Sequence, residues 1–175
     1  MATPSLKRRV MTWVGGGTIG VASTILVNHL QTQEGFSPTV YKDPVGIKTY
    51  CYGETHNADP NKVYSKEYCQ YLLSHKAADY IYKVRELIPH SVYLSPQELA
   101  AWGSFAYNVG FPTFQHSTAF KLLREGRRHA ACRQLPRWVY ATEASSGSRV
   151  RLKGLVNRRE VEMRLCYSGA SQGDI

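Results

Sequence analysis

The sequence carries its strongest structural signal between Glu34 and Gly53, which reads EGFSPTVYKDPVGIKTYCYG. Its Gly, Pro, Thr and Tyr residues, interspersed with β-branched residues, predict the end of a short helix at Glu34 and then a small hairpin or three-stranded sheet over residues 41–52. Two carboxylates nine residues apart, Glu34 and Asp43, flank a turn. A helix end followed by a hairpin can bring two such residues face to face across a cleft, which is the pairing that glycoside hydrolysis needs.

The rest of the chain is predicted to be mainly helical. Helices are predicted over residues 65–87, 95–110, 117–125, 128–141 and 155–167, with a loop over 145–148. The stretch from Ser95 to Glu98 combines an N-cap, Pro at the first helical position and Glu at the third, and Gly169 is interpreted as the stop of the last helix. These signals predict an α+β fold, with a small β-sheet lobe and a mainly helical lobe.

An uncharged apolar run precedes the first carboxylate. Residues 7–9 are basic, the 18 residues from 10 to 27 are largely apolar, and no charge occurs up to residue 33. This length is close to the ~20 residues of a membrane helix, and the basic flank predicts that the body lies outside. Glycine and hydroxyl residues dilute the apolar character, which favours a weakly held, uncleaved signal-anchor. A secretory signal peptide cleaved near Ala22 is the alternative, and a buried core helix is a third interpretation.

Composition restricts the partners of the protein. The 175 residues suit one compact domain, and 43% of them are hydrophobic. Lys and Arg outnumber Asp and Glu by 22 to 13, a net charge of +9, so the surface attracts a polyanion such as nucleic acid, anionic lipid or bacterial cell wall. The charge does not choose among these three. No basic block with interleaved aromatic residues occurs, which argues against nucleic acid.

The four cysteines are predicted to form two disulfides. Cys51, Cys69, Cys132 and Cys166 include no C-x-x-C spacing, which argues against a structural zinc site. In an exported protein an even count favours disulfides, with three possible pairings. The pairs Cys51–Cys69 and Cys132–Cys166 are favoured, because each closes one half of the chain. Four reduced, buried thiols are the alternative for a body that stays in the cytoplasm.

The order Glu34, Asp43, Thr49 resembles the catalytic signature of phage-type lysozymes, glycoside hydrolase family 24. The similarity covers residues 30–167: residues 104–110 resemble the helix and turn that line the family's cleft, and residues 154–162 resemble its C-terminal signature. The resemblance implies a lysozyme-like two-lobed fold. Together with the apolar run, it predicts three parts: an N-terminal signal-anchor (1–30), a catalytic domain (31–170) and a loose tail (171–175).

The resemblance further implies a role for each residue. Glu34 would be the general acid, Asp43 the charged partner, and Thr49 the hydroxyl that positions a water molecule. The reaction would be hydrolysis of the β-1,4 bond between N-acetylmuramic acid and N-acetylglucosamine, without metal or cofactor. A water-positioning Thr49 favours inversion, with the carboxyls roughly 6.5–9.5 Å apart. Asn108 is a cleft-side hydrogen-bonder or a turn residue, and Arg137 is a candidate contact for the acidic peptide stem.

The apolar run adds a resemblance to the signal-anchor-release endolysins of phages and prophages. Residues 10–30 would hold the protein in the inner membrane, facing the periplasm of a Gram-negative host, and loss of the membrane potential would release a monomeric enzyme. Some members of this group carry Cys at the position of Asp43 and a further Cys inside the anchor. This chain has Asp43 and no Cys in residues 10–30, so activation by disulfide exchange is not supported here. The alternatives are a lytic transglycosylase, which needs only the acid, and a tethered wall-binding protein without catalysis. Arg158 and Arg159 are expected on a solvated or salt-bridged helix face.

Overall fold

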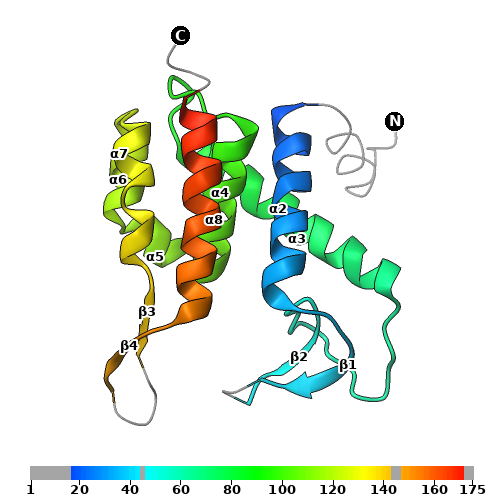
Figure 1. Ribbon diagram of the computed structural model, residues 1–175. Helices are drawn as coiled ribbons and strands as arrows, with labels where there is room; N and C mark the ends of the chain where they lie inside the picture. Colours follow the sequence, from blue (N-terminus) through cyan, green and yellow to red (C-terminus); the bar gives the residue numbers. More distant parts are fainter. Residues whose placement is uncertain (1–16, 44–45, 143–146, 172–175) are drawn as a thin grey trace, which may run out of the picture.

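The computed structural model describes residues 17–43, 46–142 and 147–171. In chain order, the elements are α2 (Thr18–Glu34), β1 (Ser37–Lys42), β2 (Lys48–Cys51), α3 (Lys66–Leu87), α4 (Pro96–Val109), α5 (Phe111–Gln115), α6 (Thr118–Arg124), α7 (Arg128–Cys132), the 3-10 helix η1 (Leu135–Arg137), β3 (Tyr140–Thr142), β4 (Arg149–Arg151) and α8 (Lys153–Ala170). Figure 1 shows α2, α4 and α8 side by side, with the hairpins β1–β2 and β3–β4 at one end of the helical body. The predicted α+β architecture is confirmed.

Helix α4 lies at the centre of the core. Its capping box is formed as predicted, because Ser95 Oγ accepts from the backbone N–H of Glu98 and Glu98 Oε2 accepts from the backbone N–H of Ser95. Trp102 and Phe105 are fully buried, and the helix packs against α2, α3 and α8. Glu98 is buried as well, and its carboxylate forms two 2.8 Å hydrogen bonds with the guanidinium of Arg128. The cap therefore also attaches α7 to the core.

Helix α2 belongs to the same core. Ala22, Leu26 and Leu30 are fully buried, and the helix packs on α3 and α4. Leu26 reaches α4 closely because Gly103 has no side chain: a Cβ at that position would lie 3.0 Å from Cδ2 of Leu26. The buried hydroxyl of Ser23 donates to the carbonyl of Ile19 one turn earlier, so this polar group is satisfied within the helix.

The predicted membrane segment, residues 10–30, overlaps α2. Its part up to residue 16, and the basic residues before it, lie outside the described residues. Within the part of the chain that the structure describes, no helix combines the length and the apolar character needed to cross a membrane.

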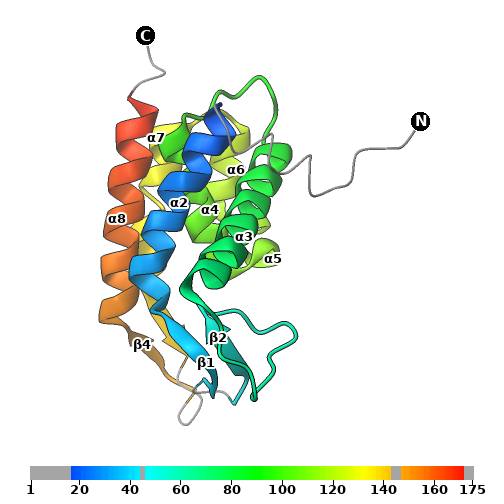
Figure 2. The same cartoon turned by 90° about the vertical axis from the view of Figure 1, so that its right-hand side faces the viewer.

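The strands β1 and β2 form an antiparallel hairpin, with Tyr41 paired to Thr49 and a register shift between Ser37 and Tyr41. An isolated bridge between Tyr50 and Glu54 extends it. Figure 2 shows this hairpin following directly from the end of α2. Of the two predicted alternatives, the two-stranded one is therefore correct.

Both disulfides have the pairing that the sequence favoured. Cys51–Cys69 joins the end of β2 to α3, and Cys132–Cys166 joins α7 to α8. The first bond joins the hairpin to the helical body. Its Cys51 has a left-handed backbone φ of 55°. A non-glycine residue is uncommon in this conformation and is retained only where its surroundings fix it.

The predicted helix over 128–141 is wrong. Helix α7 ends at Cys132, the short η1 follows, and the chain enters β3 at Tyr140. Pro136 lacks an amide proton and would disrupt a continuous helix, and the residues after it, Trp138 to Tyr140, have β-branched or aromatic side chains typical of strands. The hairpin β3–β4 was not predicted. The loop predicted over 145–148 falls partly outside the described residues.

Gly169 does not stop the last helix, because α8 continues to Ala170. The residue has to be glycine for a packing reason. A Cβ there would overlap the Ser95 side chain and lie 2.9 Å from the backbone nitrogen of Glu98. Gly169 thus lets α8 lie directly on the first turn of α4.

Replacing Gly169 by Ala is expected to destabilise the fold by roughly 1–3 kcal/mol, because the added methyl group must displace the start of α4. Urea unfolding of the purified protein measures this. Gly154→Ala is the matched control in the same helix, since a Cβ there meets nothing within 4 Å. The control should be neutral or more stable by up to ~1 kcal/mol, and equal losses in both variants would contradict the packing explanation.

Candidate active site

Glu34 ends α2 at the junction between the hairpin and the helical body. The next residue, Gly35, turns the chain with a φ of 68°. The Glu34 side chain is 24% exposed, and its Oε1 accepts a 2.8 Å charge-assisted hydrogen bond from Nη1 of Arg158 on α8. Gly53 lies on the other side, since a Cβ there would be 3.7 Å from Oε2 of Glu34. The carboxylate is therefore held between the two lobes and stays accessible to solvent.

Tyr107 of α4 also borders this carboxylate. Its hydroxyl lies 3.5 Å from the carbonyl oxygen of Tyr52 and would be 3.8 Å from a Cβ at Gly53. Burial raises the pKa of Tyr107, and the negative charge of Glu34 raises it further. The phenol therefore stays protonated and available as a hydrogen-bond donor beside Glu34.

Asp43 and Thr49 both lie on the hairpin. Asp43 follows β1, and its Oδ1 accepts from the backbone N–H of Ile47, which fixes the turn. Thr49 lies in β2, is 5% exposed, and donates its hydroxyl to the carbonyl of Ile47 at 3.1 Å. The hairpin thus places Asp43 and Thr49 on one small element next to the helix end that carries Glu34. The separation of the two carboxyls and the roles of all three residues stay predictions.

A buried ion network on α8 was not predicted from the sequence. Arg158 and Arg159 are 6% and 1% exposed, so the expected solvated face is wrong, while the alternative of a salt-bridged face is correct. Both pair with Glu162, which is fully buried and also accepts from the Ser104 hydroxyl at 2.6 Å. The spacings of three and four residues on one helix signal these pairs, but no local pattern signals the contact of Arg158 with Glu34.

His29 of α2 lies beside the same network. Its ring is 7% exposed, and among the described residues its Nε2 has no hydrogen-bond partner. Burial lowers the pKa of His29 to about 4, and the positive charges of Arg158 and Arg159 act in the same direction. The docked helix therefore carries a neutral imidazole.

The two residues predicted to bind substrate are exposed. Asn108 lies in the last turn of α4. Arg137 ends η1, forms a 3.0 Å hydrogen bond with Gln134, and lines an open pocket of about 240 Å³ together with Trp138 and Arg149. A second cation in this pocket is compatible with an anionic ligand, but the substrate-binding role of both residues stays a prediction.

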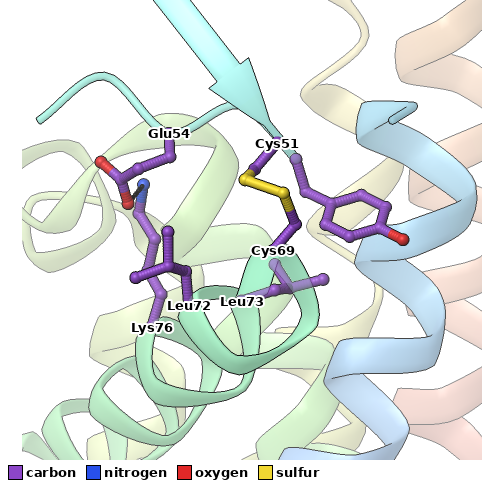
Figure 3. Close-up of a pocket in the computed structure, with 7 residues that line it drawn as sticks. Cys51, Glu54, Cys69, Leu72, Leu73 and Lys76 are labelled. Atoms are coloured by element: carbon purple, nitrogen blue, oxygen red, sulfur yellow. Dashed lines mark hydrogen bonds and ion pairs between the residues drawn. A yellow bond between two sulfur atoms is a disulfide. The ribbon is translucent and has the colours of Figure 1, made fainter. Parts of the chain in front are cut away.

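A small cavity next to the Cys51–Cys69 disulfide is not the substrate cleft. Figure 3 shows it between the disulfide and the ion pair of Glu54 with Lys76, whose charged atoms are 3.5 Å apart. Its volume of about 10 Å³ suits a single water molecule. The ion pair joins the hairpin region to α3, so it supports the lobe that carries Thr49.

Solved structures place this architecture in the lysozyme-like class. The muramidase domain of SpmX from Asticaccaulis excentricus is similar with a TM-score of 0.73 at 26% sequence identity, over 81% of this chain and 93% of that domain. The active form of the P1 phage endolysin Lyz is similar with a TM-score of 0.64 at 22% identity, over 87% and 97% of the two chains. The expected two-lobed lysozyme fold is thereby confirmed.

The chain belongs to the phage lysozyme family, whose profile matches residues 31–162. It is 36% identical over 171 residues to the SAR-endolysin of bacteriophage PS119, covering 95% of this chain and 97% of that protein. It is 35% identical over 170 residues to the SAR-endolysin of Enterobacteria phage P21, with 95% and 98% coverage. Membership of this family makes the protein a glycoside-hydrolase-type enzyme.

The neutral, buried His29 predicts that stability depends on pH. The pKa of His29 is about 4 in the folded state, below the ordinary value of 6.5. Between these two pH values the imidazole is protonated in the unfolded chain and neutral in the folded chain. The free energy of unfolding should therefore fall as the pH is lowered from about 6.5 to 4, by roughly 3 kcal/mol for this residue. Urea unfolding across this range measures the effect. His29→Gln should flatten the slope, whereas substitution of the exposed His56 should not; equal slopes in all three proteins would contradict the assignment.

Proposed function

We propose that this protein is an endolysin that hydrolyses the β-1,4 bond between N-acetylmuramic acid and N-acetylglucosamine in peptidoglycan, the lysozyme reaction. The observation that carries the proposal is the half-buried Glu34 carboxylate between the hairpin and the helical body, with Arg158 and Tyr107 around it. The names of the relatives, SAR-endolysins and a muramidase domain, support the same activity.

In this mechanism Glu34 gives a proton to the leaving oxygen. The carboxyl must therefore hold a proton when the glycan is bound, although Arg158 stabilises its charged form. We infer that bound glycan weakens the contact with Arg158, and that the contact forms again once the proton has left. Asp43 stabilises the positive charge that develops on the sugar ring, and the Thr49 hydroxyl orients the attacking water.

Glu34→Gln is expected to lower the rate of wall hydrolysis by about a thousandfold or more, because it removes the general acid. Asp43→Asn should lower it by about a hundredfold. Zymograms and the release of new reducing ends from purified peptidoglycan measure both effects. Glu86→Gln, on the exposed face of α3, is the matched control and should retain parental activity.

The products separate this proposal from its alternatives. Hydrolysis leaves a reducing end on the muramic acid, whereas a transglycosylase leaves a 1,6-anhydro ring. Anhydro products together with full activity in Asp43→Asn would contradict the hydrolytic mechanism. A parent protein that binds the wall without cleaving it would contradict catalysis altogether.

We further propose that residues 10–30 first hold the protein in the inner membrane, facing the periplasm, and that their release activates it. The packing of α2 supports this order of events. Leu26 and Leu30 fill the core of the body and the same helix ends at Glu34, so these residues cannot lie in the bilayer while Glu34 contacts Arg158. The membrane-held form would therefore lack the assembled site.

Depolarising the host membrane is expected to move the full-length protein from the membrane fraction to the periplasmic fraction. Fractionation and mass determination before and after addition of an uncoupler measure this. A variant with Leu in place of Gly15, Gly16 and Gly17 is more apolar and should stay in the membrane fraction. A shortened protein that is soluble before depolarisation would instead indicate a cleaved signal peptide and overturn the release mechanism.

A further inference from the structure

We propose that Glu162 is a positioning residue of the active site, which orients Arg158 toward the catalytic acid Glu34. This inference rests on the proposed function of Glu34. The geometry behind it is a continuous path of contacts from the interior of the helical body to the Glu34 carboxylate.

The guanidinium of Arg158 uses each of its nitrogens. Nη1 donates to Oε1 of Glu34 at 2.8 Å, Nε faces Oε1 of Glu162 at 3.4 Å, and Nη2 faces the backbone carbonyl of Ser104 at 3.5 Å. One side of the planar group thus contacts the acid, and the rest contacts α4 and α8. Because a guanidinium is rigid, fixing its inner side also fixes the direction of Nη1.

Glu162 is itself held in place from several directions. The Ser104 hydroxyl donates to its Oε1 at 2.6 Å, Nη2 of Arg159 donates to the same oxygen at 2.8 Å, and Nε of Arg159 lies 2.7 Å from Oε2. Burial raises the pKa of Glu162, and the neighbouring Arg159 acts against this shift. The carboxylate is fully buried, so these contacts fix its position inside the helical body.

The charges balance only when α2 is docked. Arg158 and Arg159 carry two positive charges, and Glu162 supplies one negative charge from α8. The second negative charge comes from Glu34. A buried ion pair contributes little net stability compared with apolar residues of similar size. The specific effect of this network is that it directs Nη1 of Arg158 toward the helix end that carries the acid.

Glu162→Gln tests the proposal, because it keeps the shape of the side chain and removes its charge. Arg158 then loses the partner that holds its inner side, so its contact with Glu34 loosens and stabilises the charged carboxylate less. The titration midpoint of the Glu34 carboxyl, followed by ¹³C NMR on the full chain and assigned with Glu34→Gln, should therefore rise. The alkaline limb of the activity profile should move in the same direction. The kcat should fall by at least tenfold with KM within about twofold.

Two further variants separate positioning from stability. Glu160→Gln removes the same charge from an exposed position on the same helix and should leave both the titration and the activity unchanged. Ser104→Ala keeps every charge and removes one hydrogen bond to Glu162; it should lower kcat about threefold without moving the titration. It also decides the case if Glu162→Gln does not fold, since a parental kcat in Ser104→Ala would then overturn the proposal.

A Glu34 titration that is unmoved or lowered in folded Glu162→Gln would overturn the proposal, because loss of the Glu162 charge alone lowers the midpoint. An activity loss that only follows the loss of folded protein would also overturn it. The titration needs no substrate. It therefore tests the inference even if the parent releases no reducing ends, a result that would count against the proposed function instead.

Discussion

The ion pair between Glu34 and Arg158 connects residues 124 positions apart in the sequence. It joins the last residue of α2 to the second turn of α8, two helices that both pack on α4 and run in opposite directions (Figures 1 and 2). No turn or strand pairing within either segment can create this contact. It forms only when α2 lies in its place on α3 and α4, so the geometry of the catalytic carboxyl depends on the packing of the first described helix.

That packing is restricted by shape and by charge. Gly103 provides the space that Leu26 occupies, and larger residues there would push α2 away from α4. Burial and the positive charges of Arg158 and Arg159 lower the pKa of His29 to about 4, so its ring is neutral at neutral pH. Glu34 then contributes the negative charge that balances Arg158. The packed side of α2 thus has to fit the space beside Gly103 and also match the charges of α8. Both requirements determine where the end of the helix, and with it Glu34, is placed.

Sequence reasoning was accurate where the signal was local. The capping box at Ser95 and the hairpin after Glu34 were predicted because cap and turn residues act over a few positions. It failed where distant contacts decide the outcome. Gly169 has the residue type of a helix stop, but contact with α4 explains it. The sequence predicts a solvated or salt-bridged face for Arg158 and Arg159, whereas the link of Arg158 to Glu34 depends on the tertiary fold.

The composition of α2 follows from the two environments that the proposed release gives it. Under the proposed release this helix would lie first in lipid and then in a protein core, and an unsatisfied hydroxyl is costly in both environments. Ser23 and Thr24 meet this condition because their hydroxyls donate to carbonyls of their own helix, those of Ile19 and Gly20. The same small residues keep the segment only weakly apolar, so under the proposed release departure from the bilayer would cost little. Packing against α3 and α4 then stabilises the released helix, and with it the contact between Glu34 and Arg158. Under the proposed release, the residues of α2 would therefore have two effects. They would make the helix weakly apolar, so that it can leave the bilayer, and they would let it pack on α3 and α4, which assembles the catalytic site.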